Sequence, residues 1–399
     1  MQYNFDEIID RKGTNCIKYD AMEDFLGADS DVIPLWVADT DFKVADFIMD
    51  ALRQRLDHEI LGYTYRCENY FSAIQGWMKR RHNWEVKKEW ITFSPGVVAG
   101  LTLAIEALTK PGDKVVVQPP VYFPFFDSVN GTDRVLVENP LKKESGRYHF
   151  DLEDFKSKID DKTKMIIISN PHNPGGMVWT REELAALGQI CIENDILIVS
   201  DEIHQDLAFS GHKFTPMASV SEEIAKRTIT CTAGSKTFNI AGLTTSIVII
   251  PNRRYRVAYE RKLHTPHLHM GNIMGGIALE QAYTHGDDWV DQMMAYVEGN
   301  YNMLEAFLKK HIPEIVPMKP EGTFLVWLDC SALGMEDEEL HEFMLKKAKV
   351  GLNDGPKFGK GGEGYLRINL GCPQSVLKQA LEQMASAVRS RVEDTSTVL

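Results

Sequence analysis

Short apolar segments alternate with amphipathic segments from about residue 85 to residue 250, and this alternation limits the folds that the chain can adopt. Strands are predicted at 90–94, 114–118, 165–169, 196–200, 228–231 and 246–250. A helix predicted at 97–109 ends before Lys110-Pro111-Gly112-Asp113, and another begins at Thr180, where Glu183 completes a Thr-x-x-Glu capping box. Buried strands that alternate with helices predict an α/β fold with a mostly parallel sheet covered on both faces.

The pattern changes after about residue 290. Helices are predicted at 291–310, at 337–349 and from Pro373 onward, and strands at 323–328 and 365–370. These segments predict a smaller α+β domain, and the first 45 or so residues, which lack the alternating pattern, are expected to pack with it. We therefore predict a large ligand-binding domain at 46–290 and a small domain made of 1–45 and 291–399.

The composition excludes several classes of function. The chain has 399 residues, of which 44% are apolar and 25% charged, as in an ordinary globular protein with room for two domains. A net charge of −13 argues against nucleic-acid and anionic-membrane partners. No apolar run approaches the roughly 18 residues of a membrane helix, and the first residues lack the pattern of a secretory signal. The cytoplasm is the predicted location.

Metal and dinucleotide sites are not predicted. The six cysteines are scattered without a C-x-x-C pair, and no carboxylate or cysteine accompanies the histidine cluster at 264–269. We expect that cluster to form a loop near the mouth of the ligand site. The segment 359–364 matches G-x-G-x-x-G, but it leads into a predicted strand instead of a helix, so a flexible loop is expected.

Polar residues follow several predicted strands directly, namely Ser94-Pro95-Gly96, Asn173, Asp201 and Ser235-Lys236. Because ligands bind beyond the carboxyl ends of strands in open α/β sheets, we expect these residues along one edge of one sheet. Lysine can form a Schiff base with an aldehyde, aspartate can pair with a pyridinium nitrogen, and asparagine can donate to a ring oxygen. The combination predicts an enzyme that uses pyridoxal 5'-phosphate (PLP).

Each of these residues also has a plainer interpretation. Asp201 at a strand–helix junction is a common helix N-cap, and Asn173 between two prolines is typical of a turn. Ser94-Pro95-Gly96 is either an ordinary turn or the start of a helix whose free amides bind the cofactor phosphate. The cofactor site is favoured over these separate explanations, because all of these residues follow strands and all have the chemistry that the cofactor requires.

Two further residues are candidates for the same site. Tyr122 follows the strand at 114–118 and could stack on a flat ring or pack in the core, where its neighbours Phe123, Phe125 and Phe126 are expected. Arg367 alternates with apolar residues in the strand at 365–370. It is therefore either a surface residue or a bidentate clamp for a substrate carboxylate.

Seven motifs carry a resemblance to a known family: Leu35-Trp36-Val37-Ala38-Asp39, Gly62-Tyr63-Thr64, Gly96-Val97-Val98, Asn170-Pro171-His172-Asn173-Pro174, Ser200-Asp201-Glu202-Ile203-His204, Ser235-Lys236-Thr237-Phe238-Asn239-Ile240-Ala241-Gly242 and Leu366-Arg367-Ile368-Asn369-Leu370. Nearly end to end, the chain resembles the fold-type I PLP enzymes, which share the aspartate aminotransferase fold. Within them it is most similar to the cystathionine β-lyase/cysteine desulfhydrase branch of bacterial C–S lyases.

The resemblance implies a role for each matching residue. It places Lys236, Asp201, Asn173, Tyr122, Val97, Val98, Ser235 and His204 at the cofactor, with Val97, Val98 and Ser235 at its phosphate, and places Arg367 and Asp39 at the substrate. Lys236, Asp201 and Tyr122 would be the catalytic residues. Tyr63 would reach the phosphate from the neighbouring subunit of a homodimer with shared sites, and nearby Tyr65 is the other candidate for this contact.

One departure helps to choose the branch. Many aminotransferases of this fold carry a phosphate-binding arginine eight residues after the lysine, and here that position is Thr244. We therefore predict β-elimination on cystathionine or cysteine-type sulfur amino acids, which releases a thiol (homocysteine or sulfide), pyruvate and ammonia. An aminotransferase and a PLP-binding regulatory protein with little catalysis remain the alternatives.

Overall fold

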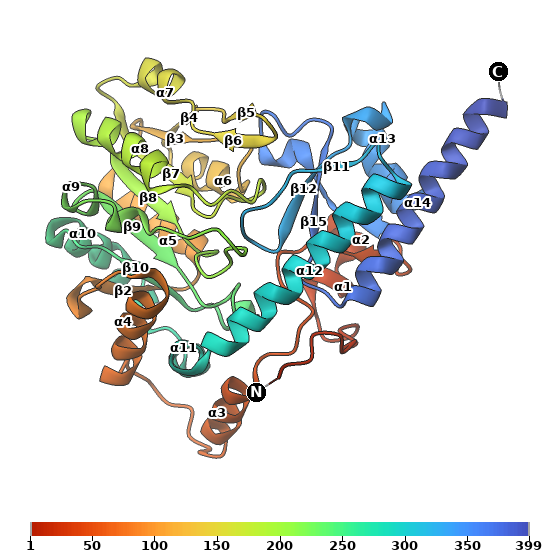
Figure 1. Cartoon of the computed structure of the whole chain (residues 1–399). Coiled ribbons are helices and arrows are strands. Elements are labelled where there is room, and N and C mark those ends of the chain that lie inside the picture. Colours follow the sequence, from red (N-terminus) through yellow and green to blue (C-terminus); the bar gives the residue numbers. More distant parts are fainter. Residues whose placement is uncertain (1, 398–399) are drawn as a thin grey trace.

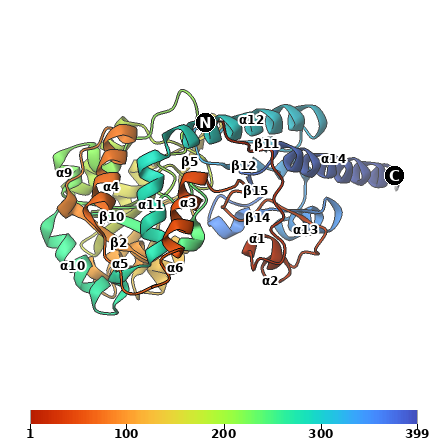
Figure 2. The ribbon, with the colours of Figure 1, turned by 90° about the horizontal axis from the view of Figure 1, so that it is seen from below.

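The computed structural model describes residues 2–397, with side chains described through residue 391. A large lobe surrounds one twisted sheet, and a smaller lobe lies beside it (Figure 1). The long helix α12 (Asp287–His311) follows α11 (Ile273–His285) in the large lobe and packs on α14 (Gln374–Thr397) in the small one (Figure 2). The prediction of a helix at 291–310 is confirmed, although the helix in the structure begins four residues earlier, at Asp287.

The large sheet has seven strands among the described residues. In spatial order they are β2 (Ile91–Ser94), β10 (Ser246–Ile249), β9 (Thr228–Thr232), β8 (Leu197–Asp201), β7 (Thr163–Ser169), β3 (Lys114–Val117) and β4 (Val135–Glu138). Of these strands, β10 runs antiparallel to its two neighbours and the other pairs are parallel. The predicted mostly parallel sheet is confirmed. The edge strand β4 escaped prediction because it is short and only partly buried.

Helices cover both faces of this sheet, as the alternating pattern predicted. One face carries α5 (Val97–Leu108), α6 (Pro124–Asn130) and α10 (Arg253–His264), and the other carries α7 (Leu152–Lys158), α8 (Arg181–Glu193) and α9 (Glu222–Ala225). The predicted capping box is present at the start of α8, where Thr180 and Glu183 bond each other's backbone amides. Helices α4 (Glu68–His82) and α11 pack together beside β10.

The small lobe is built on an antiparallel sheet. Its strands, in spatial order, are β11 (Val316–Pro317), β12 (Leu325–Asp329), β15 (Tyr365–Asn369) and β14 (Asn353–Asp354). Helix α13 (Asp337–Glu342) continues as a π-helical turn over Phe343–Lys347, so the helix predicted at 337–349 is shorter and less regular than expected. The segment 359–364 is the loop that leads into β15, as predicted.

The N-terminal residues pack with the C-terminal part of the chain. Helices α1 (Ile17–Asp20) and α2 (Met22–Leu26) lie against the small lobe (Figure 2). Strand β1 (Ile33–Pro34) pairs in parallel with β13 (Val350–Gly351). The domain boundaries given above stay a prediction.

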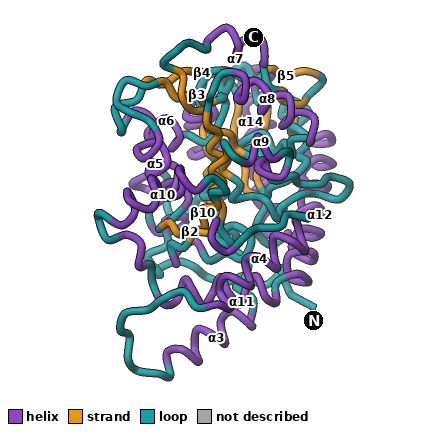
Figure 3. Tube along the Cα trace, turned by 90° about the vertical axis from the view of Figure 1, so that its left-hand side faces the viewer, coloured by secondary structure: helices purple, strands orange, loops and turns teal. Residues whose placement is uncertain are grey.

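Two further segments leave the body of the large lobe. The hairpin of β5 (Lys142–Glu144) and β6 (Arg147–His149) reaches the small lobe, where Lys143 pairs with Asp329 at 3.0 Å. Helix α3 (Asp46–Leu56) and the loop after it lie at one end of the molecule (Figure 3). Among the residues with described structure, no helix is both long and apolar enough to cross a membrane.

Candidate functional site

A cavity of about 150 Å³ lies at the carboxyl ends of β7 and β8 and beside the turn that follows β9. It is lined by Ala38, Val97, Val98, Tyr122, Ser169, Asn173, Asp201, Ile203, His204, Ser235, Lys236 and Ala241. Of the predicted strand-end residues, Asn173, Asp201, Ser235 and Lys236 are thus brought together, because parallel strands present their carboxyl ends at one edge. Ser94-Pro95-Gly96 does not line the cavity, but the next residues, Val97 and Val98, do. Ala38, Ser169, Ile203 and Ala241 were missed as site residues. Each carried a signal, because Ser169 is a polar strand end and the other three stand in the motifs of the family resemblance.

Lys236 stands in the turn after β9 and keeps some exposure to the cavity. Its Nζ donates a hydrogen bond to the carbonyl oxygen of Ala38 at 2.6 Å. Burial lowers the pKa of Lys236 to about 8, although the negative charge of Asp39 opposes this shift. A lysine with such a pKa is partly neutral near physiological pH, so its amine can act as a nucleophile or as a base.

Asp201 ends β8 as a buried carboxylate. One oxygen accepts a hydrogen bond from the amide of Ile203 at 3.1 Å, and the carboxylate makes no ion pair with any residue that the structure describes. Burial raises the pKa of Asp201 to about 7, and the positive charge of Lys236 offsets only part of the shift. A cationic N–H placed in the cavity would stabilise the ionised form, so this residue fits a pyridinium ring.

Arg367 lies on β15 and is only 3% exposed, so the surface alternative is wrong. Its guanidinium donates to Asn173 Oδ1 at 2.9 Å, to Asn353 Oδ1 at 2.5 Å and to the carbonyl of Trp36 at 3.0 Å, while its Nε has no partner. Burial lowers the pKa of Arg367 to about 10. A buried guanidinium held by neutral acceptors is an attractive partner for a substrate carboxylate.

The start of α5 forms another wall of the cavity. Gly96 precedes the helix with φ of 110°, a conformation that favours glycine, and no side chain caps the helix. The first amides, at Val97 and Val98, therefore have no intrahelical acceptor, and the positive end of the helix dipole lies there. With Ser235 on the same cavity, this wall suits a phosphate group.

Tyr122 and His204 also line the cavity, as predicted. The ring of Tyr122 packs on those of Phe123 and Phe125 with centroid distances of 5.4 and 6.0 Å, so it combines core packing with access to the cavity. His204 is buried, and burial lowers its pKa well below the usual value, which keeps the ring neutral. Its Nδ1 has no hydrogen-bond partner among the described residues and is available to a ligand.

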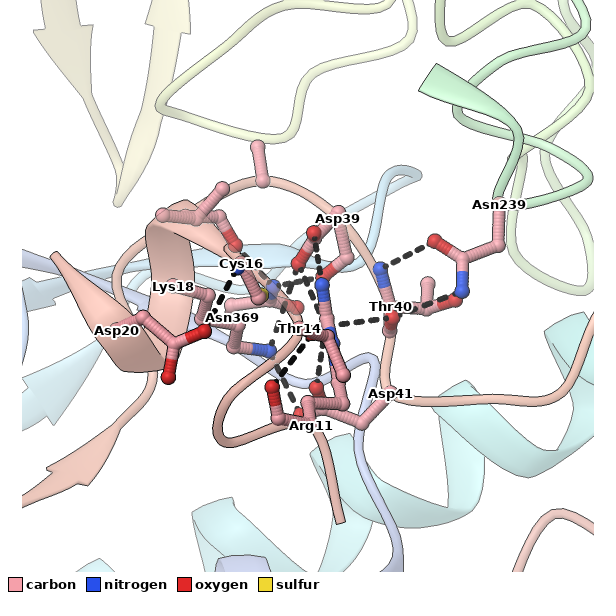
Figure 4. A network of polar contacts seen from close by, with 12 residues as sticks. Arg11, Thr14, Cys16, Lys18, Asp20, Asp39, Thr40, Asp41, Asn239 and Asn369 are labelled. Atoms are coloured by element: carbon pink, nitrogen blue, oxygen red, sulfur yellow. Dashed lines mark hydrogen bonds and ion pairs between the residues drawn. The ribbon is translucent and has the colours of Figure 1, made fainter. Parts of the chain in front are cut away.

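A backbone segment that we call the strap, residues 36–42, passes the cavity between the two lobes. Side chains donate hydrogen bonds to its carbonyl groups: Arg367 to Trp36, Asn369 to Val37 and Asp39, Lys236 to Ala38, and Asn239 to Thr40 and Phe42. Figure 4 shows Asn239 reaching Thr40 from the side opposite Arg11. The donors come from both lobes, so the strap couples the lysine turn to β15.

Asp39 was predicted to contact the substrate, but the strap residue on the cavity wall is Ala38. The Asp39 carboxylate pairs with Arg11 at 2.6 Å, and Arg11 and the buried Lys18 also pair with Asp41, at 2.6 and 2.7 Å (Figure 4). These partners are distant in sequence, so no local pattern could have indicated them. The role of Asp39 in substrate binding stays a prediction.

Tyr63 is not brought to the cavity of its own chain. It lies in the loop after α3 and is 96% exposed, and Tyr65 is also exposed. The predicted contact of either tyrosine with the phosphate of a neighbouring subunit stays a prediction.

Comparisons with known proteins agree with this geometry. Residues 30–384 match the aminotransferase class I and II family. The chain is 46% identical over 386 residues to cystathionine beta-lyase PatB of Bacillus subtilis (strain 168), covering 96% of this chain and 100% of the relative.

Two solved structures are also similar. Cystalysin from Treponema denticola, which contains a PLP cofactor, is 36% identical with a TM-score of 0.95, covering 98% of this chain and 100% of that one. A PLP-bound C–S lyase from Staphylococcus hominis is 36% identical with a TM-score of 0.91, covering 97% and 98%. The resemblance drawn from the sequence motifs is confirmed, and the chain belongs to the aminotransferase class I and II family.

Proposed function

We propose that this protein is a PLP-dependent carbon–sulfur β-lyase. Its substrate would be cystathionine or a cysteine-type amino acid, and its products a thiol, pyruvate and ammonia. The observation that carries the proposal is that Lys236 and Asp201 line the same cavity. Lys236 has a pKa of about 8, and Asp201 is a buried carboxylate without an ion pair among the described residues. The similarity to cystathionine beta-lyase PatB supports the choice of reaction.

The cavity fits the cofactor in its polar groups. Lys236 would hold PLP covalently, and Asp201 would pair with the ring nitrogen. The amides of Val97 and Val98, with Ser235, would bind the phosphate. When bound, PLP acts as an electron sink for the electrons released at the substrate Cα.

Two other wall residues complete the proposed cofactor site. The oxygen of Asn173 is already committed to Arg367, which leaves its amide NH₂ group to donate to the ring oxygen. Tyr122 would stack on the ring, and the unpartnered Nδ1 of His204 is available on the same wall.

Two residues of the chain would act on the substrate, one by binding it and one by removing a proton. Arg367 would bind the substrate α-carboxylate, since its Nε lacks a partner and its fork is held in place by Asn353 and Asn173. Once the substrate amine has displaced it, the free amine of Lys236 would take the Cα proton as general base, and the carbonyl of Ala38 would orient this amine. Loss of this proton lets sulfur leave Cβ as a thiolate, and hydrolysis of the remaining fragment yields pyruvate and ammonia.

We propose further that two chains share their active sites in a homodimer. The loop that carries Tyr63 exposes apolar residues, with Ile60 68% and Leu61 61% exposed, and such a surface is typical of a protein interface. In the dimer, Tyr63 or Tyr65 would reach the phosphate of the neighbouring subunit. We also propose the cytoplasm as the location of the enzyme.

The test is pyruvate release from L-cystathionine by the purified protein with PLP and no added keto acid. Steady release of pyruvate, abolished in the Lys236→Ala variant, is the expected result. Amino-acid turnover that requires an added keto acid would instead support an aminotransferase, the second candidate, which is named in the description of the matched family. Bound PLP without any turnover would support a regulatory protein.

A further inference from the structure

A buried carboxylate that the proposed reaction does not use lies behind Lys236. Asp206 Oδ2 accepts a hydrogen bond from the hydroxyl of Thr237 at 2.8 Å, and Thr237 directly follows Lys236. Asp206 Oδ1 accepts from Trp77 Nε1 at 2.9 Å and lies 2.8 Å from His82 Nε2. Because the side chain of Asp206 is fully buried, these protein groups replace water around the carboxylate.

The donors fix the position of this carboxylate. Trp77 Nε1 donates to Asp206 Oδ1, and the ring of His82 lies within hydrogen-bond distance of the same oxygen. Trp77 and His82 belong to α4, one of the helices packed around the large sheet. Asp206 is therefore anchored on a helix, and the Thr237 hydroxyl is anchored on Asp206.

This carboxylate joins the two segments that carry the reacting groups. Asp206 belongs to the segment that follows Asp201, the last residue of β8, and that contains His204. The amide of Leu207 donates to the carbonyl of His204, which keeps this segment tightly turned. Thr237 belongs to the turn after β9 that presents Lys236. The strand ends are already joined by the pairing of β8 with β9 and by the hydrogen bond from Thr232 to the carbonyl of Glu202. The bond between Thr237 and Asp206 adds a contact beyond the strands, directly beside Lys236.

The residues after Thr237 are anchored in other directions. Phe238 is fully buried and packs on Trp77 and Trp289 with centroid distances of 5.7 and 5.6 Å. Asn239 bonds the strap through the carbonyls of Thr40 and Phe42. Thr237, the residue next to Lys236, is thus the one whose side chain binds the segment after β8.

We propose that Asp206 is a positioning residue. By binding the hydroxyl of Thr237, it holds the amine of Lys236 in the position needed to react with the cofactor. The inference rests on the proposed function, because it concerns the lysine that would bind PLP. Neither Asp206 nor Thr237 is among the residues that line the cavity. Their effect is transmitted through the backbone of the turn.

The test compares the wild-type holoenzyme with Thr237→Val and Thr237→Ser. Valine keeps the shape of threonine and removes the hydroxyl, whereas serine keeps the hydroxyl. We expect Thr237→Val to lose about 10- to 100-fold in kcat with a smaller change in KM, since misplacement of a reacting group costs rate more than binding. We also expect a shifted pH midpoint for the visible absorbance of the lysine-bound cofactor. Thr237→Ser should restore both properties.

Thr228→Val is the matched control. Thr228 is on β9, at the end of the strand remote from Lys236, and it is as fully buried as Thr237. Its hydroxyl donates one hydrogen bond, to the carbonyl of Ile224 at 2.8 Å. The control therefore loses the same kind of buried bond and should keep the wild-type kcat and absorbance midpoint.

The outcomes separate the proposal from its alternatives. If Thr237→Val behaves like Thr228→Val, or if Thr237→Ser is impaired as strongly as Thr237→Val, the proposal is wrong. If Thr237→Val does not fold, Asp206→Asn decides, and an unchanged kcat and midpoint in that variant would also overturn the proposal.

A measurement that does not depend on turnover distinguishes the test of the positioning role from the test of the lyase activity. Borohydride reduction of the protein with PLP, followed by peptide mass analysis, measures how much cofactor is attached to Lys236. A wild-type protein that attaches PLP without releasing pyruvate would refute the lyase function, and slower attachment in Thr237→Val would still support the positioning role. Equal attachment rates and midpoints in both proteins would contradict it.

Discussion

The buried carboxylate of Asp201 allows a prediction with a definite sign and magnitude. Without cofactor, the Asp201→Asn variant should be more stable than the wild type, and the difference should increase with pH. Burial raises the pKa of Asp201 from 3.8 to about 7 in the folded protein, and asparagine has no charge to bury. The ionised carboxylate therefore works against folding until a cation reaches it.

The pKa shift fixes the direction of the pH dependence. Between about pH 4 and pH 7, the folded wild type binds more protons than the unfolded chain, so its stability decreases as pH rises through this window. The increase in the pKa of Asp201 from 3.8 to about 7 lowers the free energy of unfolding by about 2 kcal/mol at pH 5 and by about 4 kcal/mol at pH 8. The advantage of Asp201→Asn should thus grow by about 2 kcal/mol over this range.

The assay is urea unfolding of both proteins without PLP at several pH values from 5 to 8. Groups common to both proteins titrate alike, so the difference in unfolding free energy isolates Asp201. Saturating PLP should reduce or reverse the advantage of the variant, because the ring nitrogen then supplies the missing partner. A difference that is constant with pH, or larger at pH 5 than at pH 8, would refute the reasoning.

Two further predictions concern Lys236, which lines the cavity, and Arg367, which donates a hydrogen bond to the cavity residue Asn173. Lys236→Ala should lose at least about 100-fold in kcat and all covalently attached PLP, since it removes the general base and the anchoring amine; lyase turnover near the wild-type rate would contradict the mechanism. Arg367→Lys should lose about 10- to 100-fold in kcat/KM, because an ammonium cannot reproduce the guanidinium fork held by Asn173 and Asn353. The loss should be absent for amine substrates that lack the α-carboxylate, and an equal loss for both kinds of substrate would contradict the clamp.

Sequence reasoning succeeded where function depends on position along a strand. The predicted strands at 196–200 and 228–231 match β8 and β9 within one residue at each end, and they place Asp201 and Lys236 at the correct edge of the sheet. Alternation in the strand at 365–370 also identified Arg367 as different from its apolar neighbours. Local periodicity and the geometry of parallel sheets contain enough information for these conclusions.

Sequence reasoning was incomplete where function depends on distant partners. It missed strand β4, a short edge strand whose three apolar residues are at most partly buried. It missed the ion pairs of Arg11 with the strap and the bond between Thr237 and Asp206. These contacts join residues that no motif relates.

The sequence by itself determined six of the seven strands of the large sheet, the residue types at their ends and the family resemblance, because each depends on neighbouring residues. Only the tertiary structure decided which groups are buried, which are paired and what charge they carry. Lys236 meets Ala38 across 198 residues, and Arg367 meets Asn173 across 194 residues. A pKa depends on desolvation and on nearby charges, and the folded chain sets both by bringing such distant residues together.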